Sequence, residues 1–197
     1  MITLAGIAIL IVSVVLHEVS HGVVADRLGD PTARLAGRLT LNPLKHLDPM
    51  GSVVIPAMLA LSGAPFVFGW AKPVPYNPRY LRYGRLGPAL VGIAGPLSNL
   101  AIALAVGLLI RVGALDGRIA VAIVVVNLVL AVFNLIPIPP MDGSRLLAAV
   151  LPLAGRRLYA RLERGGILVA LVLVYLFGGY ILGPPVRFLF RVITGLG

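Results

Sequence analysis

One short segment carries residues of the types and spacing needed for metal chemistry: His17-Glu18-Val19-Ser20-His21. In a helix, side chains four residues apart project from one face, so the imidazoles of His17 and His21 can hold a single Zn²⁺ ion. Glu18 lies beside the first histidine, where its carboxylate can act as a base on water at that ion. The segment therefore predicts metal-assisted hydrolysis.

The setting of this segment strengthens the prediction. It lies at the end of an apolar run that begins at Ile2, and ionisable groups inside a membrane are costly unless they are paired or bind something. The alternative is that the two histidines only hydrogen-bond a neighbouring helix, with Glu18 as their counter-ion. We favour the metal site, placed inside the membrane and towards its inner face.

A hydrolytic zinc site needs a third protein ligand and one open position. The chain has no cysteine and one further histidine, His46, so the third ligand is expected to be a carboxylate. Asp142 is the best candidate because the prolines before it break the helix and can direct its side chain into the membrane. An ordinary Asp-Gly turn at a helix end is the alternative. The other candidates are Asp26, Asp30, Asp48, Asp116 and Glu163.

The composition indicates an integral membrane protein. Of the 197 residues, 59% are hydrophobic and 12% are charged, and the mean hydropathy is +1.00, outside the range of soluble domains. The absence of cysteine excludes disulfides, thiol catalysis and thiolate metal sites. The net charge of +10 comes from basic residues that flank apolar runs, which indicates anionic head groups and not nucleic acid as the partner.

The apolar runs predict an α-helical polytopic protein with about four transmembrane helices. The run from Met50 to Gly69 contains two prolines and is expected to re-enter the membrane without crossing it. This arrangement puts 13 basic residues inside and 4 outside, with the amino terminus outside, whereas five crossings would leave no charge bias. It also returns Asp142 to the side of His17 and His21. The runs are Ile2 to about Leu28, Met50 to Gly69, Leu86 to Ile110, Ile119 to Ile136 and Gly166 to Leu182.

A single domain, 1–197, is expected to contain four parts. Residues 1–28 form the helix with the histidines, and 31–85 form a small membrane-associated β-hairpin, the re-entrant segment and a proline-rich loop. Residues 86–143 form two core helices ending at Asp142 and Gly143, and 144–197 form carboxyl-terminal helices. The hairpin is predicted from the alternating pattern of Arg34 to Leu41, and the loop from the three prolines between Lys72 and Pro78.

Five motifs together resemble those of the site-2 protease family of zinc intramembrane metalloproteases. They are HEVSH at 17–21, GRLTLNPLKHLDPMG at 37–51, GWAKPVPYNP at 69–78, AGPLSN at 94–99 and NLIPIPPMDG at 134–143. The resemblance implies that His17, His21 and Asp142 hold one Zn²⁺ per chain and that Glu18 is the general base. It also implies that Asn134 assists at the scissile carbonyl.

The resemblance further implies that the substrate is a transmembrane segment of another protein, cut within the bilayer. The expected location is a prokaryotic cytoplasmic membrane, with the active site towards the cytoplasm. Many relatives carry a PDZ or CBS domain, whereas a compact form without either is expected here. Asn99 and Trp70 match family motifs and are interpreted as structural, and His46 and Asp48 as loop residues.

Two other functions could use parts of the same residue set. A membrane metal-ion carrier can also use histidine and aspartate, but carriers are often built from inverted repeats and none is visible here. A non-proteolytic binding protein on the same scaffold would not need the complete ligand set and Glu18.

Overall fold

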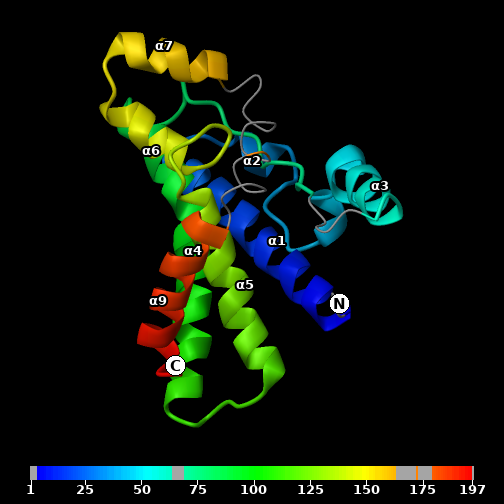
Figure 1. Cartoon of the computed structure of the whole chain (residues 1–197). Coiled ribbons are helices and arrows are strands. Elements are labelled where there is room, and N and C mark those ends of the chain that lie inside the picture. The colour runs from blue at the N-terminus through cyan, green and yellow to red at the C-terminus, as the bar shows by residue number, and fades with distance from the viewer. Residues whose placement is uncertain (1–3, 64–68, 163–171, 173–178, 197) are drawn as a thin grey trace.

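The chain is almost entirely helical in the computed structural model, which describes residues 4–63, 69–162, 172 and 179–196 (Figure 1). No strand occurs among these residues. The helices are α1 (Leu4–Arg27), α2 (Thr32–Leu35), η1 (Pro43–Lys45), η2 (Pro49–Val54), α3 (Ile55–Leu61), α4 (Leu86–Arg111), α5 (Arg118–Asn134), α6 (Gly143–Val150), α7 (Leu153–Leu162) and α9 (Gly183–Thr194).

Two helices, α1 and α4, are long and apolar enough to cross a membrane. In the core helix of a soluble protein most residues would be buried, but the most apolar stretches of α1 and α4 are only 28% and 33% buried. Large apolar side chains such as Ile11 and Val12 of α1 and Leu97 and Leu104 of α4 are exposed. This apolar surface suits contact with lipid. Together with the composition, it is consistent with a helical membrane protein.

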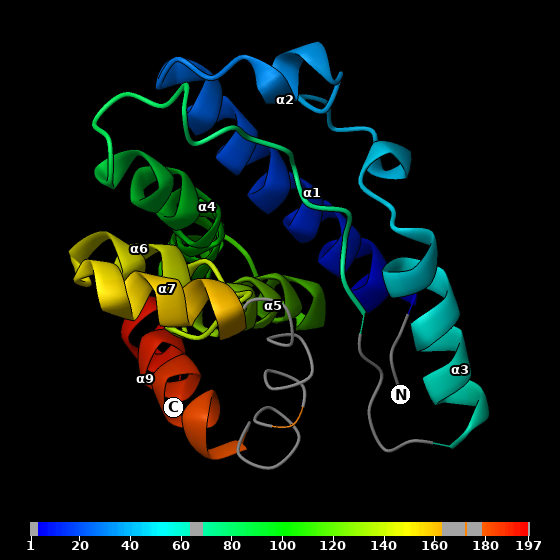
Figure 2. The same ribbon diagram turned by 90° about the horizontal axis from the view of Figure 1, so that it is seen from above.

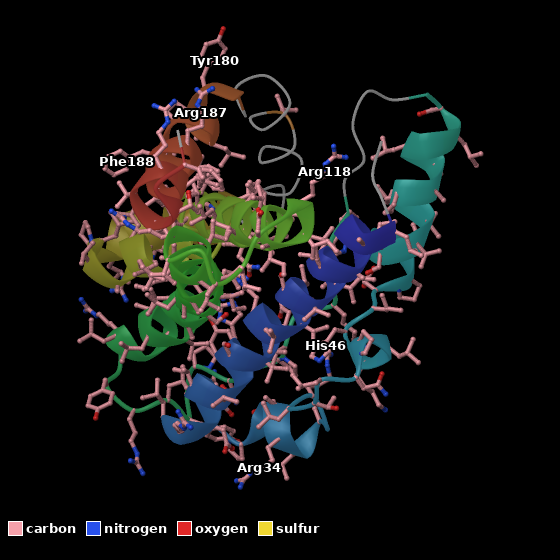
Figure 3. All side chains as sticks on the ribbon, turned by 90° about the horizontal axis from the view of Figure 1, so that it is seen from below. Arg34, His46, Arg118, Tyr180, Arg187 and Phe188 are labelled. Carbon is pink, nitrogen blue, oxygen red and sulfur yellow. The ribbon has the colours of Figure 1, made fainter. Side chains whose placement is uncertain are left out.

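Helix α4 is the centre of the bundle and contacts α1, α5, α6 and α9 (Figure 1). Small residues along α4, including Gly92, Gly95, Ala103 and Gly107, are buried and let the neighbouring helices approach closely. Ala103 packs with Val124 and Leu128 of α5 and Val186 of α9 in one cluster. Tyr180, Arg187 and Phe188 extend outward from the α9 end of the molecule (Figure 3).

The β-hairpin predicted from Arg34 to Leu41 is not found. Local hydrogen bonds use the backbone donors instead: Leu35 N donates to Pro31 O, Ala36 N to Thr32 O and Arg38 N to Ala33 O. These bonds form the short helix α2 and the turn after it, where Gly37 has a φ of +63°. The backbone therefore closes on itself and leaves no free strand edge at this position.

The proline-rich loop is extended, as predicted, and runs beside α1 (Figure 2). Three of its backbone N–H groups are bound by groups outside the loop: Lys72 N by His46 O, Val74 N by Glu18 and Asn77 N by Asp30. The prolines at 73, 75 and 78 have no N–H group, so the loop is held at its remaining donors.

The run from Met50 to Gly69 begins as the consecutive helices η2 and α3 and turns after Leu61, and residues 64–68 lie outside the described part. Most of the run from Gly166 to Leu182 is also outside it. The tail forms the helix α9, in agreement with the expected carboxyl-terminal helices.

Candidate metal centre

His17 and His21 lie one turn apart on α1 and are both buried, with exposed fractions of 5% and 6%. Their ring centroids are 4.7 Å apart, and the rings meet edge to face. The two imidazoles therefore lie together on one face of α1, as the four-residue spacing predicted.

Asp142 reaches these histidines from a distant part of the sequence. It immediately precedes α6, and its Oδ2 atom lies 3.1 Å from His17 Nε2 and 3.2 Å from His21 Nε2. Its other oxygen, Oδ1, accepts a hydrogen bond from Arg145 Nη1 at 2.7 Å. Asp142 is thus held on one side by a cation, and its second oxygen faces the two rings.

The backbone before Asp142 turns tightly, and Gly143 makes the turn possible. Ile138 N donates to Ile136 O, and Met141 N donates to Ile138 O. A Cβ atom on Gly143 would collide with the backbone of Leu135, so a side chain does not fit there. The Asp-Gly pair places the carboxylate at the depth of the histidines.

The donor atoms fit a zinc ion. His21 Nδ1 donates a hydrogen bond to the carbonyl oxygen of Val91 at 2.7 Å, which leaves a lone pair on Nε2. Candidate ligand atoms of His17, His21 and Asp142 lie within 4.8 Å of one another, and all three residues are buried. Two imidazole nitrogens and one carboxylate oxygen are a common set in catalytic zinc sites, which keep a fourth position open.

Gly95 of α4 lines the same site. A Cβ atom at this position would lie 2.5 Å from both His17 Nε2 and His21 Nε2. The missing side chain therefore leaves room at the two nitrogens that can bind a metal.

Glu18 is partly buried and follows His17 on the same helix. Its Oε2 atom accepts a hydrogen bond from the backbone N–H of Val74 at 2.9 Å. The extended loop thus holds one oxygen of the carboxylate, and Oε1 has no hydrogen-bond partner among the described residues.

Asn134 is not joined to the other site residues in this conformation. It is the last residue of α5, and its Nδ2 atom donates to the carbonyl oxygen of Leu130 on the same helix at 2.9 Å. Among the described residues this is the only hydrogen bond of its side chain.

The remaining carboxylates and His46 lie elsewhere. Asp26 pairs with Arg34, and Asp48 caps the turn at Gly51. Asp30 accepts hydrogen bonds from Thr32 and Asn77, and Asp116 bonds to its neighbour Gly117. Glu163 lies outside the described residues. His46 is on the segment between α2 and α3, across α1 from α4 (Figure 3).

Three polar residues around the site were missed in the sequence. Ser13, Asn127 and Arg145 all contact residues of the site or their direct partners. Ser13 and Asn127 could have been noticed in the sequence, because each is a polar side chain within an apolar run. Placing such a side chain inside a membrane costs free energy unless it has a partner. Arg145 lies three residues after Asp142, a spacing that suits a contact within one helical turn.

Comparisons with known proteins show which family the chain resembles. A profile described as "Peptidase family M50" matches residues 117–177. The protein "Putative zinc metalloprotease YwhC" of Bacillus subtilis is 42% identical over 188 residues, covering 89% of this chain and 82% of the relative. "Putative zinc metalloprotease Rip2" of Mycolicibacterium smegmatis is 33% identical over 181 residues, covering 86% and 68%.

No solved structure matches the chain at a significant level. The identity with YwhC extends over most of both sequences. The chain belongs to peptidase family M50, the site-2 protease family of metalloproteases.

Proposed function

We propose that the chain is a zinc-dependent endopeptidase that hydrolyses peptide bonds within transmembrane segments of other membrane proteins. The observation that carries this proposal is the buried group of His17, His21 and Asp142, with Glu18 adjoining it. Buried ligands next to a carboxylate that can transfer protons suit hydrolysis better than transport, which needs no such base.

The proposed ligand atoms are Nε2 of His17, Nε2 of His21 and one oxygen of Asp142. When bound there, zinc supplies a Lewis acid that polarises a carbonyl group and lowers the pKa of water. Arg145 holds Asp142 Oδ1, so that Oδ2 is the oxygen presented to the histidines.

Glu18 is the proposed general base and acid. Its carboxylate takes a proton from the attacking water and delivers it to the nitrogen of the leaving amine. The Val74 N–H group holds Oε2, so Oε1 is the oxygen available for this transfer. Asn134 is the proposed donor to the scissile carbonyl, a role that requires its amide to leave the Leu130 carbonyl and turn towards the substrate.

The depth of the site favours a membrane-embedded substrate. At about 1.5 Å per residue, His17 lies roughly 20 Å along α1 from Leu4, and a hydrocarbon core is about 30 Å thick. The site is therefore within the bilayer, nearer the Arg27 end of the helix. A peptide bond at that depth belongs to a transmembrane segment.

The same proposal includes the topology expected from the sequence. Four crossings, a re-entrant segment at 50–69 and an outside amino terminus put 13 basic residues on the cytoplasmic side of the cell membrane and 4 outside. The whole of 1–197 would then form one protease domain, with the active site towards the cytoplasm.

Cleavage in a reconstituted membrane tests the proposal. The full chain is placed in liposomes with a panel of single-span membrane proteins, and the products are mapped by mass spectrometry. We expect cuts inside the hydrophobic span by the wild type and none by Glu18→Gln. Cuts only in water-exposed regions would contradict an intramembrane protease. Zinc uptake into the liposomes without any cleavage would favour the carrier.

A further inference from the structure

Three polar side chains are buried beside the proposed metal site and have no part in the reaction described above. Ser13 of α1, Asn99 of α4 and Asn127 of α5 have exposed fractions of 3%, 0% and 0%. Hydrogen bonds connect them to each other, and Asn99 connects them to His17. This cluster of Ser13, Asn99 and Asn127 is called the amide cluster below.

The direction of each hydrogen bond follows from a backbone carbonyl, which can only accept. Asn127 Nδ2 lies 2.9 Å from the carbonyl oxygen of Ile123, so this end of the Asn127 amide is the donor. Asn127 Oδ1 is therefore the acceptor that faces Asn99, and Asn99 Nδ2 donates to it at 2.8 Å. Asn99 Nδ2 also lies 3.4 Å from the backbone carbonyl oxygen of Ser13, so Asn127, at the shorter distance, and Ser13 both orient the Asn99 amide.

The orientation of Asn99 in turn determines where His17 carries its proton. Asn99 Oδ1 lies 2.6 Å from His17 Nδ1 and can only accept, so Nδ1 carries the hydrogen. With a metal bound at the site, Nε2, which lies 3.1 Å from Asp142 Oδ2, would then carry the lone pair. His17 is held in the tautomer that can bind a metal through Nε2.

His21 reaches the same tautomer in a different way. Its Nδ1 donates to the Val91 backbone carbonyl, which offers an acceptor whatever the neighbouring side chains do. The amide of Asn99 has a donor end and an acceptor end of nearly the same shape. If it turned over, its N–H would face His17 Nδ1, the proton would move to Nε2, and the metal would lose a ligand.

We propose that Asn127 is a positioning residue, which orients the Asn99 amide and thereby keeps His17 in the metal-binding tautomer. The proposal rests on the proposed metal site. Two hydrogen bonds fix the orientation of the Asn127 amide itself. Asn127 Nδ2 donates to the Ile123 carbonyl oxygen and to Ser13 Oγ, the latter at 3.0 Å.

Zinc affinity tests this role without a substrate. The purified full chain is titrated against a competing zinc chelator as the wild type, Asn127→Leu and Asn99→Leu. Partners that orient a histidine ligand typically change metal affinity by about 10–100-fold, so we expect both variants to bind more weakly by roughly that factor. The double variant should be no weaker than Asn99→Leu, because Asn127 acts only through Asn99.

A carboxylate at position 99 separates positioning from simple packing. Both oxygens of a carboxylate accept, so Asn99→Asp can hold the His17 proton in either orientation and needs no help from Asn127. We expect the Asn99→Asp/Asn127→Leu variant to recover zinc affinity to within about 3-fold of the wild type. Val125→Ala, at a residue of the same helix that is 37% exposed, is the control and should bind as the wild type.

Several results would overturn the proposal. Wild-type affinity in Asn127→Leu, or failure of Asn99→Asp to rescue it, would show that Asn127 does not act through the orientation of Asn99. If Asn127→Leu does not fold, nitrogen NMR of the zinc-loaded wild type can show which ring nitrogen of His17 carries the proton. The chain has only three histidines, so their signals can be told apart. We expect His17 to carry its proton on Nδ1 and to bind zinc through Nε2. Zinc bound through His17 Nδ1 would refute the role of Asn127.

The failure of the proposed function would look different. If wild type and His17→Ala bound zinc equally well, the metal site itself would be wrong. Weaker binding by His17→Ala with unchanged binding by Asn127→Leu would leave the site intact and remove only the positioning role.

Discussion

Replacing Gly95 with alanine is expected to weaken zinc binding strongly while keeping the helix. The new methyl group would lie 2.5 Å from Nε2 of both His17 and His21, where carbon and nitrogen normally remain about 3.4 Å or more apart. Both atoms are proposed ligands, so the methyl group would displace at least one of them or fill the space beside the metal.

The size of the effect follows from the ligand bonds. Zinc to histidine distances are about 2.0–2.1 Å, with a tolerance of about 0.2 Å, and the conflict at Gly95 is several times larger. Four-ligand structural zinc sites bind with about 10–16 kcal/mol, or about 3 kcal/mol for each ligand. Loss of one ligand would therefore weaken binding by about 100-fold.

A chelator competition titration measures this loss, and thermal unfolding of the metal-free protein gives the control. Alanine is a better helix former than glycine by about 1 kcal/mol, so the metal-free variant is not expected to lose helix. Gly179→Ala is the matched substitution, because a Cβ atom there meets no heavy atom of the described residues within 4 Å. Zinc affinity within about 3-fold of the wild type in Gly95→Ala would refute the placement of the metal between these rings and α4.

Three further predictions concern the surroundings of the site. Arg145→Gln should weaken zinc binding by about 10-fold in the same titration, because Asp142 Oδ1 loses its cationic partner; unchanged affinity would contradict this role. Asp30→Ala should lower stability to thermal unfolding by about 2–4 kcal/mol, because it is fully buried and accepts hydrogen bonds from Thr32 and Asn77; an unchanged unfolding temperature would count against it. Removal of metal by a chelator should stop cleavage in liposomes and added zinc should restore it, whereas cleavage that resists the chelator would exclude a metal-dependent reaction.

The grouping of His17, His21 and Asp142 was predictable from helix geometry and from the course of the chain between them. The spacing of His17 and His21 depends only on helix geometry. Asp142 was identified from the prolines before it and from the number of membrane crossings that returns it to the same side. The hydrogen bond from Val74 to Glu18 was not predictable, since it joins α1 to a loop 56 residues later in the sequence.

The amide cluster shows a different limit. Ser13 and Asn127 are visible as polar residues in apolar runs, but their partner depends on how α1, α4 and α5 rotate against each other. Asn99 was interpreted as a structural contact between helices, and the structure shows that contact, to α1 and α5, and also joins Asn99 to His17. Helix rotation is a property of packing, which periodicity in a nearly uniform apolar run does not reveal.

The hairpin prediction failed because the alternating pattern does not match the burial of these side chains. Alternation of apolar and polar residues predicts a strand because apolar side chains are assumed to need burial within the protein. Here Leu35 and Leu41 are 80% and 65% exposed, whereas Arg38 is 7% exposed and donates to the Lys72 carbonyl. Apolar side chains near a bilayer can face lipid, so alternation of apolar and polar residues does not show that one face of the segment is buried within the protein.

The zinc content of the purified chain tests the central claim most directly. We expect about one zinc per chain in the wild type and in Glu18→Gln, and little in Asp142→Ala, because Asp142 is a proposed ligand and Glu18 is not. A metal-free wild type after incubation with zinc, or equal zinc in Asp142→Ala, would contradict the site formed by His17, His21 and Asp142.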